Sequence, residues 1–157
     1  MEKLKIIGGN RLSGTISCSG AKNAALPMLA ATILTDKPVT FKNLPYLQDI
    51  TTMFEILGSM GADITLNENM DFRISTANLH DFEARYELVK TMRASILVLG
   101  SLVARHGFAR IALPGGCAIG TRPVDFHLSA LEQLGARIEL KNGYIEASAK
   151  KLIGCEI

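Results

Sequence analysis

Tryptophan is absent from this 157-residue chain, and aromatic residues make up only 6% of it. Neither basic nor acidic residues are in large excess, because 17 basic and 15 acidic residues give a net charge of +2. No long basic run is present. This balance argues against a nucleic-acid-binding or membrane-surface protein. A small anionic ligand remains compatible with it.

Long hydrophobic runs are missing as well. The longest apolar stretches, residues 24–34 and 94–104, contain Pro27 or Gly100 and fall well short of the roughly 20 residues that cross a bilayer. Glu2 lies among the first residues, and no charged region leads into an apolar core, so nothing resembles a secretion signal. We therefore expect a cytoplasmic protein.

Cysteine is limited to Cys18, Cys117 and Cys155. An odd number at wide spacing fits neither a disulfide framework nor a set of zinc ligands, and we expect reduced thiols. Hydrophobic residues account for 48% of the chain, and no repetitive or purely polar tract interrupts it. The sequence therefore predicts one globular domain of modest size.

Glycine and proline gather in one segment, residues 114–125. Three glycines and two prolines there surround Cys117 and Arg122. Such a segment cannot continue a helix or a central strand, so it predicts a mobile surface loop that exposes the Cys117 thiol to a ligand. A plain turn with an incidental cysteine is the alternative.

An internal repeat is the second strong feature. Residues 24–34 predict an apolar helix and residues 38–41 a strand, and about 70 residues later the same order recurs at 94–104 and 108–111. Chance similarity between two ordinary α/β halves is the alternative.

The second halves of the two units agree more closely. Gly61 and Gly135 each follow a predicted helix and precede a strand, as expected of helix C-caps. Each unit thus reads helix, strand, helix, strand, strand, with an Asn142-Gly143 hairpin turn in the second. The predicted later helices are residues 49–60 and 125–134, and the predicted hairpin strands are 64–66, 72–74, 137–140 and 144–147.

Basic residues stand at the start of both apolar helices. Lys22, followed by Asn23, precedes the first helix, and Arg93 precedes the second. A cation at a helix N-terminus opposes the helix dipole, so this placement favours an anion nearby, such as a phosphate, with Arg122 as a third cation. The alternative is that these are ordinary solvated surface residues.

Four motifs together resemble one enzyme family. They are residues 19–27 (SGAKNAALP), 90–95 (KTMRAS), 113–120 (LPGGCAIG) and 122–127 (RPVDFH). In this order and spacing they resemble the N-terminal portion of the UDP-N-acetylglucosamine 1-carboxyvinyltransferases, the enolpyruvyl transferases of peptidoglycan synthesis. The resemblance implies an α/β fold, an inside-out barrel of repeated units that is incomplete here.

The resemblance also implies an activity. The family moves the enolpyruvyl group of phosphoenolpyruvate to the 3-hydroxyl of UDP-N-acetylglucosamine and releases phosphate, without a metal or cofactor. This is the first committed step of peptidoglycan synthesis, so it serves cell wall biogenesis, cell shape and cell division. In the family, the epoxide fosfomycin alkylates the residue that matches Cys117.

Residue roles follow from the matched motifs. Cys117 would be the general acid, and Lys22 and Arg122 would bind phosphoenolpyruvate. Asn23 would orient the sugar and Arg93 would face the nucleotide-sugar and phosphate region. His127 matches the family too, although a structural role is equally open. The uridine would lie against a run formed by Arg122, Pro123, Val124 and Asp125, with Asp125 accepting from the base.

Length is the departure from the family, whose members have two domains of three repeats each. The resemblance implies that residues 1–21 belong to the other domain, and that residues 22–157 form a partial domain with two of three repeats. Partners would then be the two substrates and a missing C-terminal half, or a second copy of the chain. The alternative is a non-catalytic binding or interaction module that keeps part of the nucleotide-sugar site.

Overall fold

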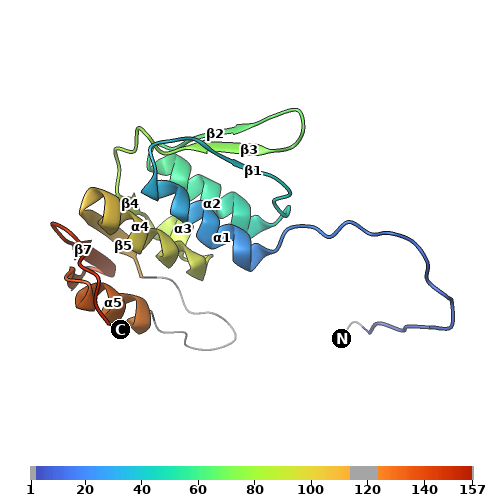
Figure 1. The fold of residues 1–157 in the computed structure, drawn as a ribbon. Helices are drawn as coiled ribbons and strands as arrows, with labels where there is room; N and C mark the ends of the chain where they lie inside the picture. Colours follow the sequence, from blue (N-terminus) through green and yellow to red (C-terminus); the bar gives the residue numbers. More distant parts are fainter. Residues whose placement is uncertain (1–2, 114–123, 157) are drawn as a thin grey trace.

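The computed structural model describes residues 3–113 and 124–156, which form two successive helix-and-sheet units (Figure 1). The first unit contains α1 (Lys22–Ala31), the 3-10 helix η1 (Thr32–Leu34), β1 (Val39–Phe41), α2 (Gln48–Ser59), β2 (Asp63–Leu66) and β3 (Phe72–Ser75). The second contains β4 (Glu83–Ala84), α3 (Tyr86–Val89), the 3-10 helix η2 (Arg93–Ile96), α4 (Leu97–His106), β5 (Phe108–Ala112), α5 (Asp125–Gln133), β6 (Arg137–Lys141) and β7 (Tyr144–Ser148).

The strand order confirms the predicted repeat. The first sheet has the order β1-β3-β2, and within the second sheet β5-β7-β6 repeats it, with antiparallel pairing throughout. Strand β4 is an addition that lies parallel to β5 at the edge of the second sheet. A common order of equivalent strands is what a duplicated unit requires, so the similarity of the two halves extends beyond sequence.

Four of the residues with positive φ stand where turns and caps were predicted. Asn142 (φ 50°) and Gly143 (φ 80°) join β6 to β7, as a type I′ hairpin turn requires. Gly61 (φ 101°) and Gly135 (φ 97°) follow α2 and α5. Both predicted helix C-caps are therefore confirmed.

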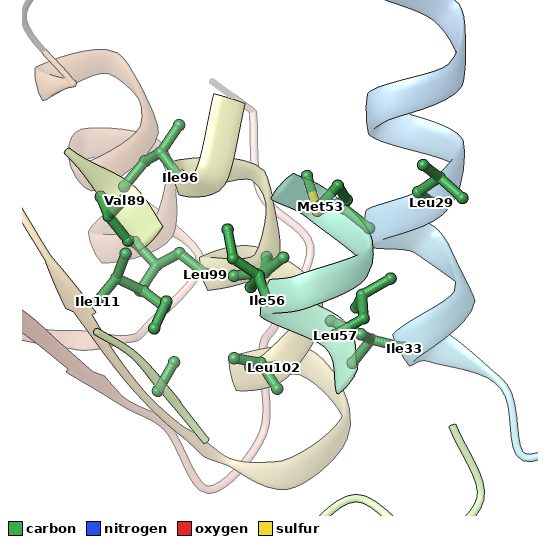
Figure 2. Close-up of a cluster of buried hydrophobic side chains, with 14 of the residues drawn as sticks. Leu29, Ile33, Met53, Ile56, Leu57, Val89, Ile96, Leu99, Leu102 and Ile111 are labelled. Carbon is green, nitrogen blue, oxygen red and sulfur yellow. The ribbon is translucent and has the colours of Figure 1, made fainter. Parts of the chain in front are cut away.

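The core lies between the helices and the inner faces of the two sheets. Helix α1 packs against α2 and α4, and the second sheet closes the far side (Figures 1 and 2). Buried side chains recur on α2 at the spacing of one helix face, as at Met53, Ile56 and Leu57, and they belong to the same buried cluster as Leu99 and Leu102 of α4. The apolar run at 94–104 therefore belongs to the interior of a domain.

Arg105 joins the two units. This side chain near the end of α4 donates from Nη1 to the carbonyl oxygens of Ile33 (2.8 Å), Thr35 (2.8 Å) and Thr76 (3.2 Å). The Thr76 hydroxyl also lies 3.2 Å from Nη1, and it lies within hydrogen-bonding distance of the carbonyl oxygens of Thr32 (2.7 Å) and Thr35 (2.9 Å). One guanidinium thus ties the end of η1 to the segment after β3.

Residues 3–21 form no helix or strand, and they extend away from the helices (Figure 1). Their apolar side chains face solvent, from Ile7 at 81% exposure to Leu4 at 98%. The resemblance makes residues 4–7 a strand of the other domain, and no strand forms there in this structure. Their assignment to another domain stays a prediction.

His106 predicts a dependence of stability on pH. Burial lowers its pKa from the ordinary value of 6.5, and the Arg105 cation lowers that pKa further. Its ring stacks on Phe82 with centroids 4.5 Å apart, and within the described residues Nε2 has no hydrogen-bond partner. His106 therefore binds a proton near pH 6.5 in the unfolded chain, but only at lower pH in the folded chain. Because the unfolded state then binds more protons, the free energy of unfolding decreases as pH falls below about 6.5.

Replacing His106 by phenylalanine keeps the ring contact and removes the titration. We expect urea denaturation of H106F to show a shallower loss of stability between about pH 7 and pH 5 than the unsubstituted chain shows. The exposed His80 provides the matched control as H80Q. An equal loss of stability in H106F and the unsubstituted chain would contradict a role for this imidazole.

Candidate substrate site

A pocket of about 400 Å³ lies where the first turns of α1, α2, η2 and α5 meet. It brings together Lys22, Asn23, Arg93 and His127, four residues singled out by sequence that are far apart along the chain. Its apolar wall includes Leu26, Met92 and Leu97. Such a mixture of convergent polar groups and apolar lining is typical of a small-molecule site.

Lys22 and Asn23 reach the pocket because α1 begins with them. They are the first two residues of the helix in the structure, whereas the sequence analysis predicted them to lie just before it. Ala21 provides no side-chain cap, and the first turn carries no acidic residue. The Lys22 ammonium therefore stands at the unfavourable end of the helix dipole, where an anion would offset it.

Asp49 supplies an anion from within the chain. Its Oδ2 lies 2.9 Å from Lys22 Nζ, and it occupies the first turn of α2, where the helix dipole favours a carboxylate. The two side chains are 46% (Lys22) and 33% (Asp49) exposed, as in a surface ion pair of modest strength. Since an ammonium has three donors, the pair leaves Lys22 able to bind a ligand anion as well.

Sequence reasoning missed Asp49. The only signal was an acidic residue at the start of a predicted helix, which ordinarily indicates helix stabilisation. Only the packing of α1 against α2 brings this carboxylate to Lys22.

Arg93 enters the pocket from the second unit. It opens η2, and its partly buried side chain lines the cavity beside Thr91 and Ala94. The predicted helix at residues 94–104 thus begins as a 3-10 turn before it becomes α4. Equivalent places in the two units therefore deliver a lysine and an arginine to one cavity.

His127 lies in the first turn of α5 and is exposed. It also borders a second, mainly apolar pocket of about 300 Å³ between α4 and α5, which shares Ile96 and Leu97 with the first. Of the predicted uridine contacts, Val124 is buried at 8% exposure and Asp125 is exposed, and neither lines the two pockets. Cys117, Arg122 and Pro123 lie outside the described residues.

Within residues 3–113 and 124–156, no group of three or more histidine, cysteine, aspartate or glutamate side chains is arranged to hold a metal ion. In the same ranges, no helix has the length and apolar character that crossing a membrane requires.

Comparison with known proteins gives a consistent family. Residues 6–157 match the family model of EPSP synthase (3-phosphoshikimate 1-carboxyvinyltransferase). The whole chain is 57% identical to UDP-N-acetylglucosamine 1-carboxyvinyltransferase from Halorhodospira halophila (strain DSM 244 / SL1), over 38% of that protein's length.

Solved structures give the same result for the fold. The enolpyruvyl transferase NikO from Streptomyces tendae superposes with a TM-score of 0.77 at 27% identity, over 96% of this chain and 33% of that chain. EPSP synthase from Acinetobacter baumannii superposes with a TM-score of 0.65 at 16% identity, over 89% of this chain and 33% of that chain. The predicted α/β architecture of repeated units is thus confirmed, and the described residues contain two sheets rather than a closed barrel.

These relatives are all carboxyvinyl or enolpyruvyl transferases, and this chain spans only about a third to two fifths of their length. The family model covers nearly all of the chain, including every residue that lines the pocket. The chain therefore belongs to the EPSP synthase family of carboxyvinyltransferases.

Proposed function

We propose that this chain is the N-terminal portion of an enzyme that transfers the enolpyruvyl group of phosphoenolpyruvate to the 3-hydroxyl of UDP-N-acetylglucosamine. The observation that carries the proposal is the single pocket that gathers Lys22, Asn23, Arg93 and His127. The chain is 57% identical to a protein named UDP-N-acetylglucosamine 1-carboxyvinyltransferase, and this similarity supports the choice of acceptor. On this proposal the chain serves peptidoglycan synthesis in the cytoplasm.

Two cations in the pocket suit two anionic substrates. Phosphoenolpyruvate carries a phosphate and a carboxylate, and the acceptor carries a diphosphate. Lys22 binds the phosphoenolpyruvate anion together with Arg122, while Arg93 faces the phosphates of the nucleotide sugar. Asn23, adjacent to Lys22 at the start of α1, can donate and accept hydrogen bonds and orients the sugar.

The reaction needs an acid, and Cys117 fills that role. The thiol gives its proton to the methylene carbon of phosphoenolpyruvate. The sugar 3-hydroxyl oxygen bonds to the neighbouring carbon as its proton passes to a base that is not among the residues assigned here. The tetrahedral adduct then loses a proton from its methyl group and expels phosphate, which restores the enol double bond on the sugar.

The remaining assignments concern the nucleoside and the domains. The uridine lies against Arg122, Pro123, Val124 and Asp125, with Asp125 accepting from the base, and His127 takes part in substrate binding. Residues 22–157 form part of one domain, two of its three repeats, and residues 1–21 join another domain. The missing half or a second copy of the chain then completes the site.

Alkylation of Cys117 by fosfomycin tests this proposal directly. We expect mass spectrometry to find Cys117 labelled at least about ten-fold faster than Cys18 or Cys155, and labelling slowed by excess phosphoenolpyruvate. Cys18 and Cys155 are both exposed free thiols, so they serve as internal controls for simple accessibility. Iodoacetamide provides the matching control reagent, because it reports the general reactivity of all three thiols. Equal fosfomycin labelling of the three would contradict a substrate site at Cys117.

A further inference from the structure

The loop between β1 and α2 crosses directly over Gly20. A Cβ atom added to Gly20 would lie 2.2 Å from the carbonyl oxygen of Asn43 and 3.3 Å from Cδ of the buried Pro45. The Asn43 side chain holds the same crossing, because its Nδ2 donates to the carbonyl oxygen of Cys18 at 3.2 Å. Asn43 itself adopts the left-handed conformation, with φ 56°.

This crossing lies at the edge of the pocket. Gly20 is two residues before Lys22, the first residue of α1, and Ala21 accepts the first backbone hydrogen bonds of that helix from Ala24 and Ala25. Residues 3–19 are exposed, so the crossing is where this segment meets the folded body (Figure 1). The same loop leads into α2, whose Asp49 holds the Lys22 ammonium.

We propose that Gly20 and Asn43 are positioning residues, whose close contact sets where α1 begins and thus where Lys22 and Asn23 enter the pocket. The proposal rests on the proposed function, because it concerns the same anion site. The loop between β1 and α2 holds the backbone before Lys22, and the start of α2 holds its ammonium. Neither residue lines the pocket, so both act through Lys22 and Asn23.

Only glycine fits this contact. The obstructing atom at 2.2 Å is a backbone oxygen, so no side-chain rotation relieves the clash. The separation would have to grow by roughly 1 Å, and Asn43 is already in a conformation with few neighbouring alternatives. A displacement on this scale at a group that holds a reacting molecule weakens function by up to about 10²-fold.

Gly20 stands apart from the core, which separates positioning from stability. The segment before it is exposed, and the buried cluster begins at Ala25. An alanine at residue 20 therefore moves the start of α1 more readily than it opens the core. Gly8 provides a matched control in the same exposed segment, since nothing lies within 4 Å of its added Cβ.

The experiment compares the unsubstituted chain with G20A, G8A and N43G. In N43G, glycine keeps the left-handed backbone and removes the hydrogen bond that the side-chain amide of Asn43 donates to Cys18. Calorimetric titration with phosphoenolpyruvate and with UDP-N-acetylglucosamine reports affinity, and thermal unfolding reports stability. We expect Kd for phosphoenolpyruvate to rise at least about ten-fold in G20A and about three-fold in N43G. We expect G8A to match the unsubstituted chain, and the melting temperature of G20A to fall by no more than about 2 °C.

Amide NMR spectra give a readout that needs no ligand. We expect G20A to shift the signals of Lys22, Asn23 and Asp49, while those of the core stay in place. Unchanged signals at these three residues, or phosphoenolpyruvate affinity in G20A within two-fold of the unsubstituted chain, would overturn the positioning role. The spectra decide the positioning claim whether or not the unsubstituted chain binds a substrate by itself, and the labelling of Cys117 by fosfomycin tests the proposed function separately.

Discussion

Replacement of Lys22 by methionine is expected to weaken phosphoenolpyruvate binding at least about ten-fold. The ammonium lies in the pocket at the first residue of α1, and methionine keeps a side chain of similar length without the charge. Loss of one charge-assisted contact to an anion corresponds to about 1.5–3 kcal/mol, which is a factor of ten or more in Kd. The change is in binding rather than folding, because Lys22 is outside the core.

A companion substitution should act in the opposite direction. Asp49 places a negative charge in the same pocket, 2.9 Å from Lys22 Nζ. Asparagine keeps the shape of the side chain and an oxygen that accepts from Lys22, while it removes repulsion toward an incoming anion, so phosphoenolpyruvate affinity in D49N should be tighter. Opposite responses of K22M and D49N would identify the pocket as an anion site whose lysine carries the attraction.

Isothermal titration calorimetry with phosphoenolpyruvate and with inorganic phosphate measures both variants. Lys37, an exposed lysine outside the pocket, provides the matched control as K37M. We expect K37M to bind like the unsubstituted chain. An affinity of K22M within two-fold of that chain would show that Lys22 is an ordinary surface residue.

Replacement of Arg105 by methionine is expected to lower the free energy of unfolding by about 2–4 kcal/mol. The guanidinium Nη1 donates to three carbonyl oxygens on two segments of the first unit, and methionine keeps only the apolar part of the side chain. The carbonyl oxygens of Ile33 and Thr35 would lose a charged donor in a partly buried place. The Thr76 hydroxyl cannot compensate for both, because it has one hydrogen to donate.

Urea denaturation followed by circular dichroism measures this effect. Arg85 is the matched control, because its side chain is 67% exposed and its ion pair with Asp81 spans 3.4 Å. We expect R85M to change stability little, as is usual for exposed pairs. If R105M and R85M lost the same small amount, Arg105 would not hold the two units together.

Much of the fold could be predicted from local patterns. The two apolar helices, the later helices that end at Gly61 and Gly135, and the hairpin at Asn142-Gly143 all stand within a few residues of their expected places. These features depend on neighbouring residues and on glycine, so sequence spacing reveals them. β4 and α3 were not predicted, because their short segments carry no clear period. β4 forms through its parallel pairing with β5, which is a tertiary contact.

Some residues of the candidate site could likewise be predicted from the sequence, and others could not. Lys22, Asn23 and Arg93 could be chosen because each stands at the start of a predicted helix, and the pocket contains all three. Asp49 could not be chosen, because its contact with Lys22 depends on how α2 packs beside α1. The placement of Cys117 and Arg122 stays a prediction from the motif.

The sequence by itself determined the family, the repeated unit and the residue types of the pocket. The order of the motifs and the repeated order of helices and strands follow the linear sequence. They can therefore be recognised without a tertiary structure. Tertiary structure alone decided that the two units share one cavity, that Asp49 pairs with Lys22, and that Asn43 lies over Gly20. These contacts join segments far apart in sequence, and packing of the helices sets their distances, which no local pattern records.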